Sequence, residues 1–204
     1  MKKLGMILTI VAFTVTITHA QDVKFGVKGG VNFSSINGDE AESFDGRTSL
    51  HFGGVAEIMV SEKFAVQPEL LYSAQGADYE ENDFTGTVKL DYINVPVLAK
   101  FFVADGFSVE VGPQLGFLLS AKDEYDDLVG GGSGEEDIKD EAKGIDFAAA
   151  LGLGYQTEGG LNFGARYNVG LSKINDFDDT DPEFDSSDIS WKNGVIQVFV
   201  GFMF

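Results

Sequence analysis

The chain has 204 residues, of which 44% are hydrophobic and 23% are charged, and it contains no cysteine. This length suits one domain, the apolar fraction is too high for a disordered acidic chain, and the lack of cysteine excludes disulfides and thiolate chemistry. A net charge of -19 argues against nucleic-acid binding, because that binding depends on clustered lysine and arginine side chains that neutralise phosphates.

The first 20 residues have the pattern of a cleaved signal peptide. Lys2 and Lys3 make a positive start, and residues 4–17 form an apolar stretch without charge. That stretch is shorter than the ~20 residues that a membrane-spanning helix needs, which disfavours the alternative of an N-terminal anchor. We therefore predict that residues 1–20 are removed on export and that residues 21–204 form the mature domain.

The mature chain contains eight stretches in which apolar and polar residues alternate. In the clearest stretch, every odd-numbered residue from Leu161 to Leu171 is apolar, and the even-numbered residues between them are polar or glycine. A period of two is that of a β-strand and excludes a helix. The predicted strands span residues 25–33, 50–60, 64–75, 89–101, 107–120, 145–156, 161–172 and 192–204.

The connections between these strands alternate between long and short. The long ones are residues 35–48, 76–88, 121–144 and 173–191, and the short ones are residues 61–63, 102–106 and 157–160. This alternation is typical of an up-and-down meander with tight turns at one rim and long loops at the other. We predict an all-β fold, an eight-stranded antiparallel up-and-down transmembrane β-barrel, with the long loops extracellular and the short turns periplasmic.

The orientation of the two strand faces decides between two classes of barrel. A soluble, lipocalin-like, ligand-binding barrel hides its apolar face, whereas a membrane barrel turns that face outward. The polar face carries many glycines, among them Gly26, Gly53 and Gly164, which suits strands that crowd around a narrow lumen. We therefore predict that Arg166 faces the lumen and that Phe163 faces lipid.

Charged residues on the polar face are predicted to form a network inside the lumen. They are Lys28, Glu57, Glu69, Lys100, Glu110 and Arg166. Counting from the short-turn rim places them at similar depth, and an unpaired buried charge costs several kcal/mol. We expect Arg166 to pair with carboxylates from this set and the two lysines to complete the network. Separately hydrated charges in a leaky core are the alternative.

Acidic residues are concentrated in the long loops, which hold 24 of the 33. The densest run offers oxygen ligands of the kind that Ca²⁺ prefers, at Asp176, Asp178, Asp179, Asp181, Glu183 and Asp185. The run lacks the glycine turn and the glutamate spacing of an EF-hand loop, so a solvated acidic segment is the favoured interpretation. We expect no cofactor and treat this loop as a weak candidate for cation binding.

An enzymatic role depends on His51, the one histidine of the mature domain. It lies on the polar face near the long-loop end, where Ser34 and Ser49 are also expected, so it is a candidate general base. A hydrogen-bonded lumen residue is the more common role for such a histidine, and we predict that the protein is not an enzyme.

Aromatic residues near the long-loop rim are interpreted as belts at the membrane interface rather than as a ligand cage. They are Tyr72, Tyr79, Tyr92 and Trp191. Three prolines also fall within predicted strands, although proline cannot donate to a β-ladder and a closed barrel has no edge strand. We expect a β-bulge at each of Pro68, Pro96 and Pro113.

Several segments resemble a small outer-membrane β-barrel family of Bacteroidetes-type bacteria, which includes PorT-like and OmpA-type porin-family barrel domains. They are residues 26–34, 68–73, 92–100 and 112–116, and residues 198–204 are similar to the terminal strand that the outer-membrane insertion machinery recognises. The resemblance implies a bacterial outer-membrane location, with membrane lipid and the insertion machinery as partners. It supplies no catalytic residues, and it associates only PorT-like members with protein secretion.

Together these patterns predict an integral outer-membrane barrel with a lumen filled by polar side chains and with acidic extracellular loops. A structural or adhesive, surface-interaction role fits them best, and a secretion-associated role is implied by the resemblance alone. A narrow passive pore and a soluble ligand-binding barrel remain the alternatives. The sequence does not identify the extracellular partner.

Overall fold

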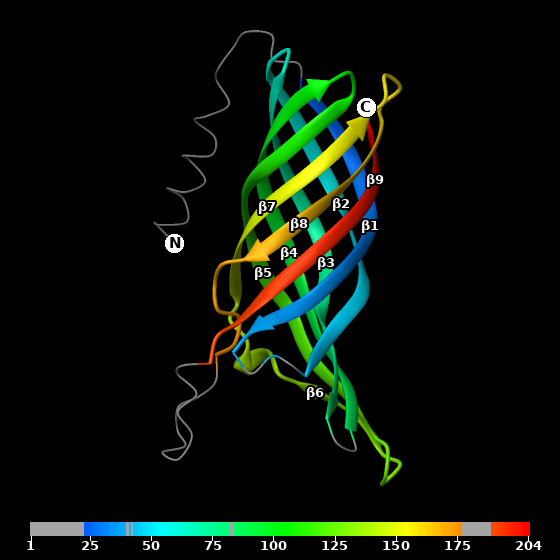
Figure 1. The fold of residues 1–204 in the computed structure, drawn as a ribbon, viewed down its shortest axis with the longest axis vertical. Helices are drawn as coiled ribbons and strands as arrows, with labels where there is room; N and C mark the ends of the chain where they lie inside the picture. Colours follow the sequence, from blue (N-terminus) through cyan, green and yellow to red (C-terminus); the bar gives the residue numbers. More distant parts are fainter. Residues whose placement is uncertain (1–22, 40, 42, 82–83, 177–188) are drawn as a thin grey trace, which may run out of the picture.

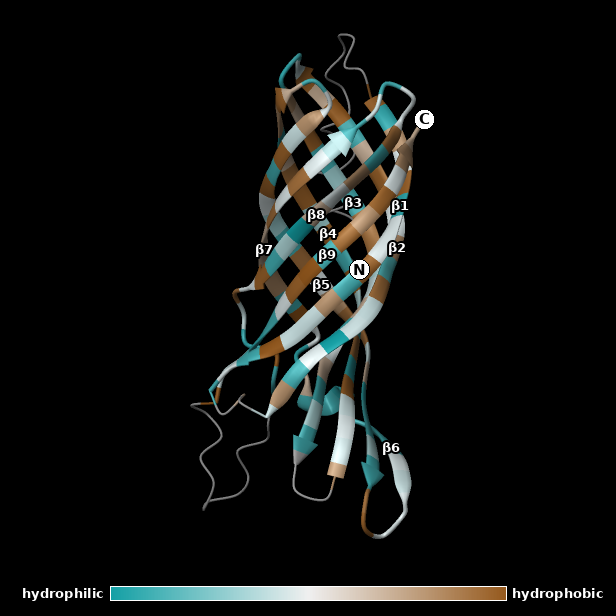
Figure 2. Ribbon diagram, turned by 45° about the vertical axis from the view of Figure 1, so that its right-hand side comes forward, coloured by the Kyte–Doolittle hydropathy of each residue, from teal (hydrophilic) through white to brown (hydrophobic). Residues whose placement is uncertain are grey.

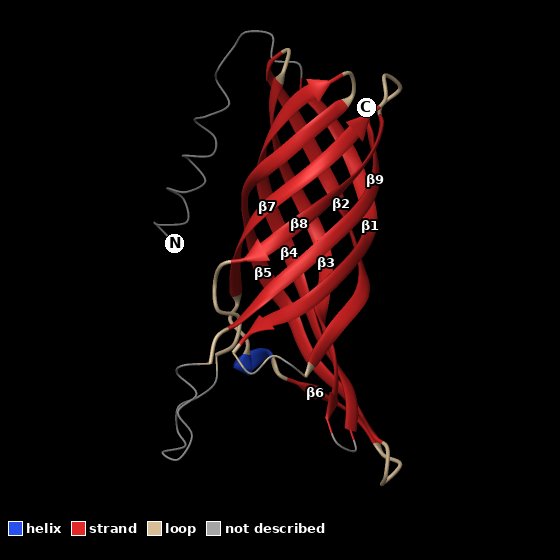
Figure 3. Cartoon of the chain, in the orientation of Figure 1, coloured by secondary structure: helices blue, strands red, loops and turns tan. Residues whose placement is uncertain are grey.

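The computed structural model describes residues 23–39, 41, 43–81, 84–176 and 189–204, and the predicted signal peptide lies outside these ranges. Figure 1 shows a tilted ring of strands, and Figure 3 shows one short helical turn beside the mouth of that ring. The ring strands are β1 (Val23–Gly38), β2 (Phe44–Ser61), β3 (Phe64–Glu81), β4 (Phe84–Ala104), β5 (Phe107–Asp127), β7 (Ile145–Gln156), β8 (Leu161–Gly170) and β9 (Trp191–Met203).

Each ring strand pairs antiparallel with its neighbours in chain order, and the pairing of β1 with β9 closes the ring. The short strand β6 (Ser133–Asp137) adds to the end of β5 and is followed by the 3-10 turn η1 (Lys139–Glu141). The predicted eight-stranded up-and-down barrel is therefore confirmed. Within the described ranges, no helix is long and apolar enough to cross a membrane.

The two faces of each ring strand differ in polarity as the alternation predicts. On β9, Val198 and Val200 point outward and are about half exposed, whereas Gln197 and Phe199 point inward and are buried. On β8, Phe163 is on the outside and Arg166 is 2% exposed. Figure 2 shows the hydrophobic residues spread over the wall of the ring. This orientation is that of a membrane barrel and the reverse of a soluble one.

Four strands run beyond the ring, and here the predicted loops were wrong. Residues 44–46, within the predicted loop 35–48, begin β2 and pair with residues 77–79 of β3. Residues 76–81 and 84–88 continue β3 and β4 as a paired hairpin, and residues 121–127 continue β5. Figure 1 shows this extension below the ring, with β6 at its end. The acidic composition suggested loops, but neighbouring strands satisfy each other's backbone groups whatever their side chains. We call residues 44–46, 76–81, 84–89, 121–127 and 133–137 the outer sheet.

The prolines do not create the expected bulges. The gap in the β3–β4 ladder follows Pro68 and contains Pro96, and the gap in the β4–β5 ladder contains Pro113, but neither gap changes the register. The register shifts lie at Gly46/His51, Met59/Ser61, Asp91/Tyr92 and Phe102/Ala104. The missing proline donors are thus accommodated by short interruptions of pairing on adjacent strands.

Candidate functional site

Arg166 of β8 lies at the centre of the lumen between two carboxylates. Its Nη1 and Nη2 each donate to one oxygen of Glu69 on β3, at 2.9 Å, and Nη2 also donates to Glu110 Oε2 on β5 at 2.7 Å. The planar guanidinium suits this two-pronged contact better than an ammonium group would. One cation therefore links strands from opposite parts of the ring.

The two predicted lumen lysines join carboxylates of the same set. Lys28 Nζ on β1 lies 2.8 Å from Glu69 Oε2 and 4.1 Å from the centroid of the Phe199 ring. Lys100 Nζ on β4 donates to Glu57 Oε2 on β2 at 2.7 Å. Glu57 thus pairs with Lys100 and not with Arg166. The six residues, which we call the lumen network, come from six strands and balance three cations with three carboxylates.

A layer of neutral polar side chains lies in the lumen on the hairpin side of the network. The amide of Asn32 donates to Ser73 Oγ at 3.0 Å, and its Oδ1 lies 2.7 Å from His51 Nδ1 and accepts from Gln197 Nε2 at 3.1 Å. Alternation places all four side chains on the polar face of their strands, but of the four only His51 was predicted as a candidate site residue. All four residues are buried.

The serines expected near His51 take other partners. Ser34 Oγ donates to the carbonyl of Gly76 at 2.8 Å, and Ser49 Oγ donates to the carbonyl of Ala74 at 2.7 Å. The His51 ring bonds an amide instead of either hydroxyl. A serine nucleophile requires a hydroxyl bonded to its base, so the structure does not bring these residues together in that arrangement.

An apolar cluster closes the hairpin end of the lumen. It consists of Ile36, Ala77, Leu90, Tyr92, Leu118, Ala121 and Ile174. Tyr92 was expected at the membrane interface but is 1% exposed, because it shares the lumen-facing parity of Asn94 and Lys100 on β4. The Tyr79 hydroxyl bonds the carboxylate of Asp123, and the Trp191 ring packs against Phe44. Of the four aromatic residues, only Tyr72 packs on the outer wall, against Phe52.

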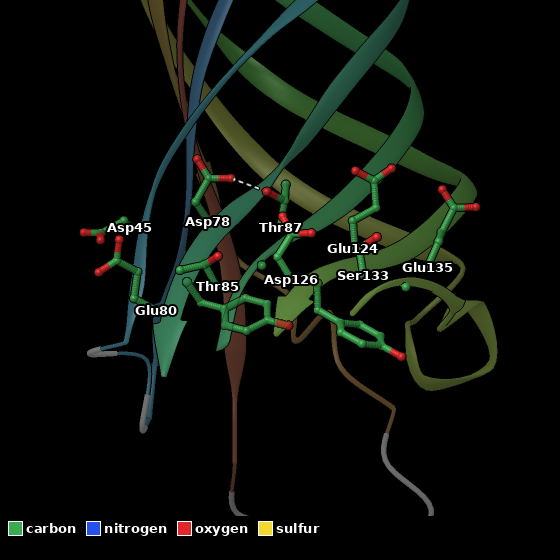
Figure 4. A pocket seen from close by; sticks show the side chains of 13 residues that line it. Asp45, Asp78, Glu80, Thr85, Thr87, Glu124, Asp126, Ser133 and Glu135 are labelled. Carbon is green, nitrogen blue, oxygen red and sulfur yellow. Dashed lines mark hydrogen bonds between the residues drawn. The ribbon is translucent and has the colours of Figure 1, made fainter. Parts of the chain in front are cut away.

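Outside the ring, acidic side chains gather on the outer sheet around a cavity of about 800 Å³ (Figure 4). The acidic lining residues are Asp45, Asp78, Glu80, Glu124, Asp126 and Glu135. Thr87 Oγ1 donates to Asp78 at 2.8 Å, and Lys122 pairs with Glu135 at 2.6 Å. Lys89 pairs with Glu124, and its hydrogen bond lowers the pKa of that carboxyl. These groups remain open to water, unlike those in the lumen.

The weak candidate loop for cations is mostly outside the described residues. Asp178, Asp179, Asp181, Glu183 and Asp185 all lie there. Asp176 is described and exposed, and its backbone N–H donates to the carbonyl of Glu141 at 2.7 Å. Among the described residues, no three acidic or histidine side chains have the arrangement of a metal site.

The fold has counterparts among known proteins. The family model of the outer membrane protein beta-barrel domain matches residues 19–176. The chain is similar to Ail, the attachment invasion locus protein of Yersinia pestis, with 14% identity over 89% of this chain and 98% of that one and a TM-score of 0.50. Neisserial surface protein A gives 14% identity, 88% and 97% coverage, and a TM-score of 0.50. No curated protein sequence matches the chain. At these identities, the solved structures show a common fold alone.

Proposed function

The chain belongs to the outer membrane protein beta-barrel domain family, and on that premise we propose that it is a closed structural barrel that presents an acidic sheet to cationic partners outside the cell. Its location is the bacterial outer membrane, where its apolar outer face contacts lipid. The proposal divides the chain into a membrane part that supplies stability and an outer part that makes contacts.

The filled lumen supports the closed barrel. The paired side chains of the lumen network are between 0% and 6% exposed. The cavity beside the network has a volume of only about 10 Å³, which is room for about one water molecule. A passive pore needs a continuous water path, whereas here an ionic layer, a polar layer and an apolar cluster follow one another along the lumen.

The position of the chain ends supports placing the outer sheet outside the cell. The N–H of Phe204 donates to the carbonyl of Phe25. The start of β1 and the end of β9 therefore lie together at the short-turn rim. A chain that enters the membrane from the periplasm leaves both ends on that side, and the insertion machinery would meet the C-terminal strand there. The hairpins at the opposite rim then face the exterior.

The acidic side chains of the outer sheet are the single observation that carries the proposal. They are fixed on paired backbone, which gives their charges defined positions. A surface with one dominant sign of charge attracts partners of opposite sign and repels like ones. An adhesive contact with a cationic protein or cationic surface follows from that sign.

Charge removal in two matched places tests the proposal. We expect purified protein in nanodiscs to bind immobilised poly-lysine and not dextran sulfate, with binding that weakens as salt rises. The triple variant Asp45→Asn, Glu80→Gln, Asp126→Asn should bind poly-lysine at least about fivefold more weakly. The control variant Glu62→Gln, Asp105→Asn, Glu158→Gln removes three exposed acids at the short-turn rim.

Equal loss of binding in both variants would show that net charge, and not the outer sheet, attracts the polycation. Conductance in a planar bilayer tests separately whether the lumen is closed. The wild-type protein should show no stable conductance. A steady open channel would contradict that half of the proposal.

A further inference from the structure

A second cavity lies at the hairpin end, directly over the apolar cluster. Its volume is about 450 Å³, and its lining includes Phe44, Tyr79, Leu90, Asp123, Ile174 and Trp191. Tyr79 also lines the acidic cavity of the outer sheet, so the two cavities are neighbours. The size is within the range of about 300–1,000 Å³ that is usual for small-molecule sites.

Three aromatic rings from three strands line this cavity, and the Phe44 ring stands at a steep angle to each of the other two. The Phe44 ring lies 5.2 Å from that of Trp191, at 84°, and 6.4 Å from that of Tyr79, at 87°. Edge-to-face contact of this kind is a preferred packing of neighbouring aromatic side chains, and it fixes the rings relative to one another. All three rings line the cavity, and a cation within about 6 Å of the face of such a ring is attracted by it.

Hydrogen bonds hold two of these rings in place without a ligand. The Trp191 indole N–H donates to the carbonyl of Asp39 at 3.0 Å, and its backbone N–H donates to Asn175 Oδ1 at 3.0 Å. The Tyr79 hydroxyl lies 3.1 Å from both carboxylate oxygens of Asp123. A cavity whose walls are fixed beforehand loses little freedom when a ligand enters.

The charge of the lining has one sign. Asp123 and Glu141 contribute carboxylates, and the described lining includes no lysine or arginine. Asp123 is partly buried, and that burial raises the pKa of its carboxyl. A cation beside a desolvated carboxylate stabilises its charge. An anion would be repelled by that charge, and a purely apolar molecule would remove still more water from it.

We propose that this cavity binds a small organic cation with an apolar body, of the alkyl- or aryl-ammonium class. The Phe44, Tyr79 and Trp191 rings surround the cationic head, Asp123 supplies the opposite charge, and the floor over Leu90 and Ile174 accepts the apolar body. The site uses the inner face of the hairpins, so it is distinct from the proposed contact surface on the outer sheet.

Trp191 gives a direct readout because it is the single tryptophan of the chain. We expect phenyltrimethylammonium to change the tryptophan fluorescence of the nanodisc-embedded protein in a saturable way. Benzenesulfonate, an aromatic anion of similar size, should cause no saturable change. A response to the cation that rises linearly without saturation would indicate partition into lipid and would overturn the proposal, as would equal responses to both probes.

Two variants and one control assign the response to the cavity. Asp123→Asn should raise the apparent Kd at least about tenfold. Gly86→Ala should also weaken binding, because a Cβ at that position would press on the far end of the Tyr79 ring, with Cε1 at 2.7 Å, and displace it. Glu124→Gln removes the neighbouring acid, which lines the other cavity, and should leave the Kd unchanged.

Heat-modifiability on a gel checks that each variant forms a barrel. If Asp123→Asn fails to fold, Gly86→Ala decides, because the Tyr79 ring can move without backbone displacement. An unchanged Kd in the folded variants, or an equal loss in Glu124→Gln, would overturn the assignment.

Discussion

The strands β3, β4 and β5 carry charges in two settings, the lumen network and the outer sheet. In the lumen, the Arg166 and Glu69 side chains are fully buried, whereas on the outer sheet the side chains of Lys89 and Glu124 are 33% and 41% exposed. Buried ion pairs are costly to break, and exposed pairs are screened by water and salt. The same pairing of opposite charges therefore contributes much to stability where it is buried in the barrel and little where water surrounds it on the outer sheet.

Removal of the central cation should produce the largest effect. Arg166→Met leaves Glu110 without its ion-pair partner and Glu69 with Lys28 alone, so we expect a loss of about 3–5 kcal/mol in the free energy of unfolding. Urea unfolding in detergent micelles, followed by tryptophan fluorescence, measures it. An unchanged midpoint would mean that the charges are hydrated separately and that the network does not contribute to stability.

Adjacent glycines on β2 sharpen the contrast between lumen and lipid face. Gly53→Ala would bring a Cβ against backbone of β3, including Leu71 Cα at 2.8 Å, so we expect a loss of about 1–3 kcal/mol. A Cβ at Gly54 would meet nothing within 4 Å, and Gly54→Ala should be neutral or slightly stabilising. The same unfolding assay compares them. Equal stability of the two variants would show that the lumen side is not crowded.

Breaking an ion pair of the outer sheet should cost little. Lys89→Met removes the partner of Glu124, and we expect a change of at most about 1 kcal/mol because both groups remain solvated. The free energy of unfolding in the same urea series measures it. A loss as large as that of Arg166→Met would erase the distinction between the two settings.

The smallest expected effect concerns a turn at the end of β5. The backbone N–H groups of Gly130 and Val129 donate to Asp127 Oδ1 and lower the pKa of its carboxyl below the ordinary value of 3.8. The turn is therefore stabilised above that ordinary value, and the stabilisation is lost as pH falls through the lowered pKa. Carboxyl NMR shifts of the protein in micelles should report this titration. A pKa of 3.8 or higher would contradict the bonded turn.

The alternation of polarity predicted the ring but not its outer extension. The period-two stretch that begins at Leu161 gave β8 to within two residues, whereas Tyr92 was assigned to the membrane interface although the parity of β4 indicates the lumen. In residues 76–88, the apolar Ala77, Tyr79 and Val88 continue the same parity, but the acids and glycines around them suggested loops. Backbone pairing with a neighbouring strand is a tertiary property, so composition alone misassigned these residues.

The sequence also did not predict which charged side chains pair with each other inside the lumen. Depth counted from the short-turn rim placed all the charges together, yet Glu57 pairs with Lys100 while Arg166 pairs with Glu69 and Glu110. The strands of a closed barrel are tilted and staggered, so equal counts from the rim do not give equal heights or neighbouring positions around the ring. The aromatic rings of the proposed cation site likewise come from β2, β3 and β9, and only ring closure, through the pairing of β9 with β1, brings β9 near the other two.

A pair of double-mutant cycles tests most directly whether the two settings differ. One cycle combines Arg166→Met with Glu69→Gln, and the other combines Lys89→Met with Glu124→Gln, each read as the coupling free energy of unfolding at low and high salt. We predict a coupling of about 2–3 kcal/mol for the lumen pair, nearly independent of salt, and below about 1 kcal/mol for the outer pair, decreasing with salt. Equal couplings with the same salt dependence would contradict the division between a dry network and a solvated surface.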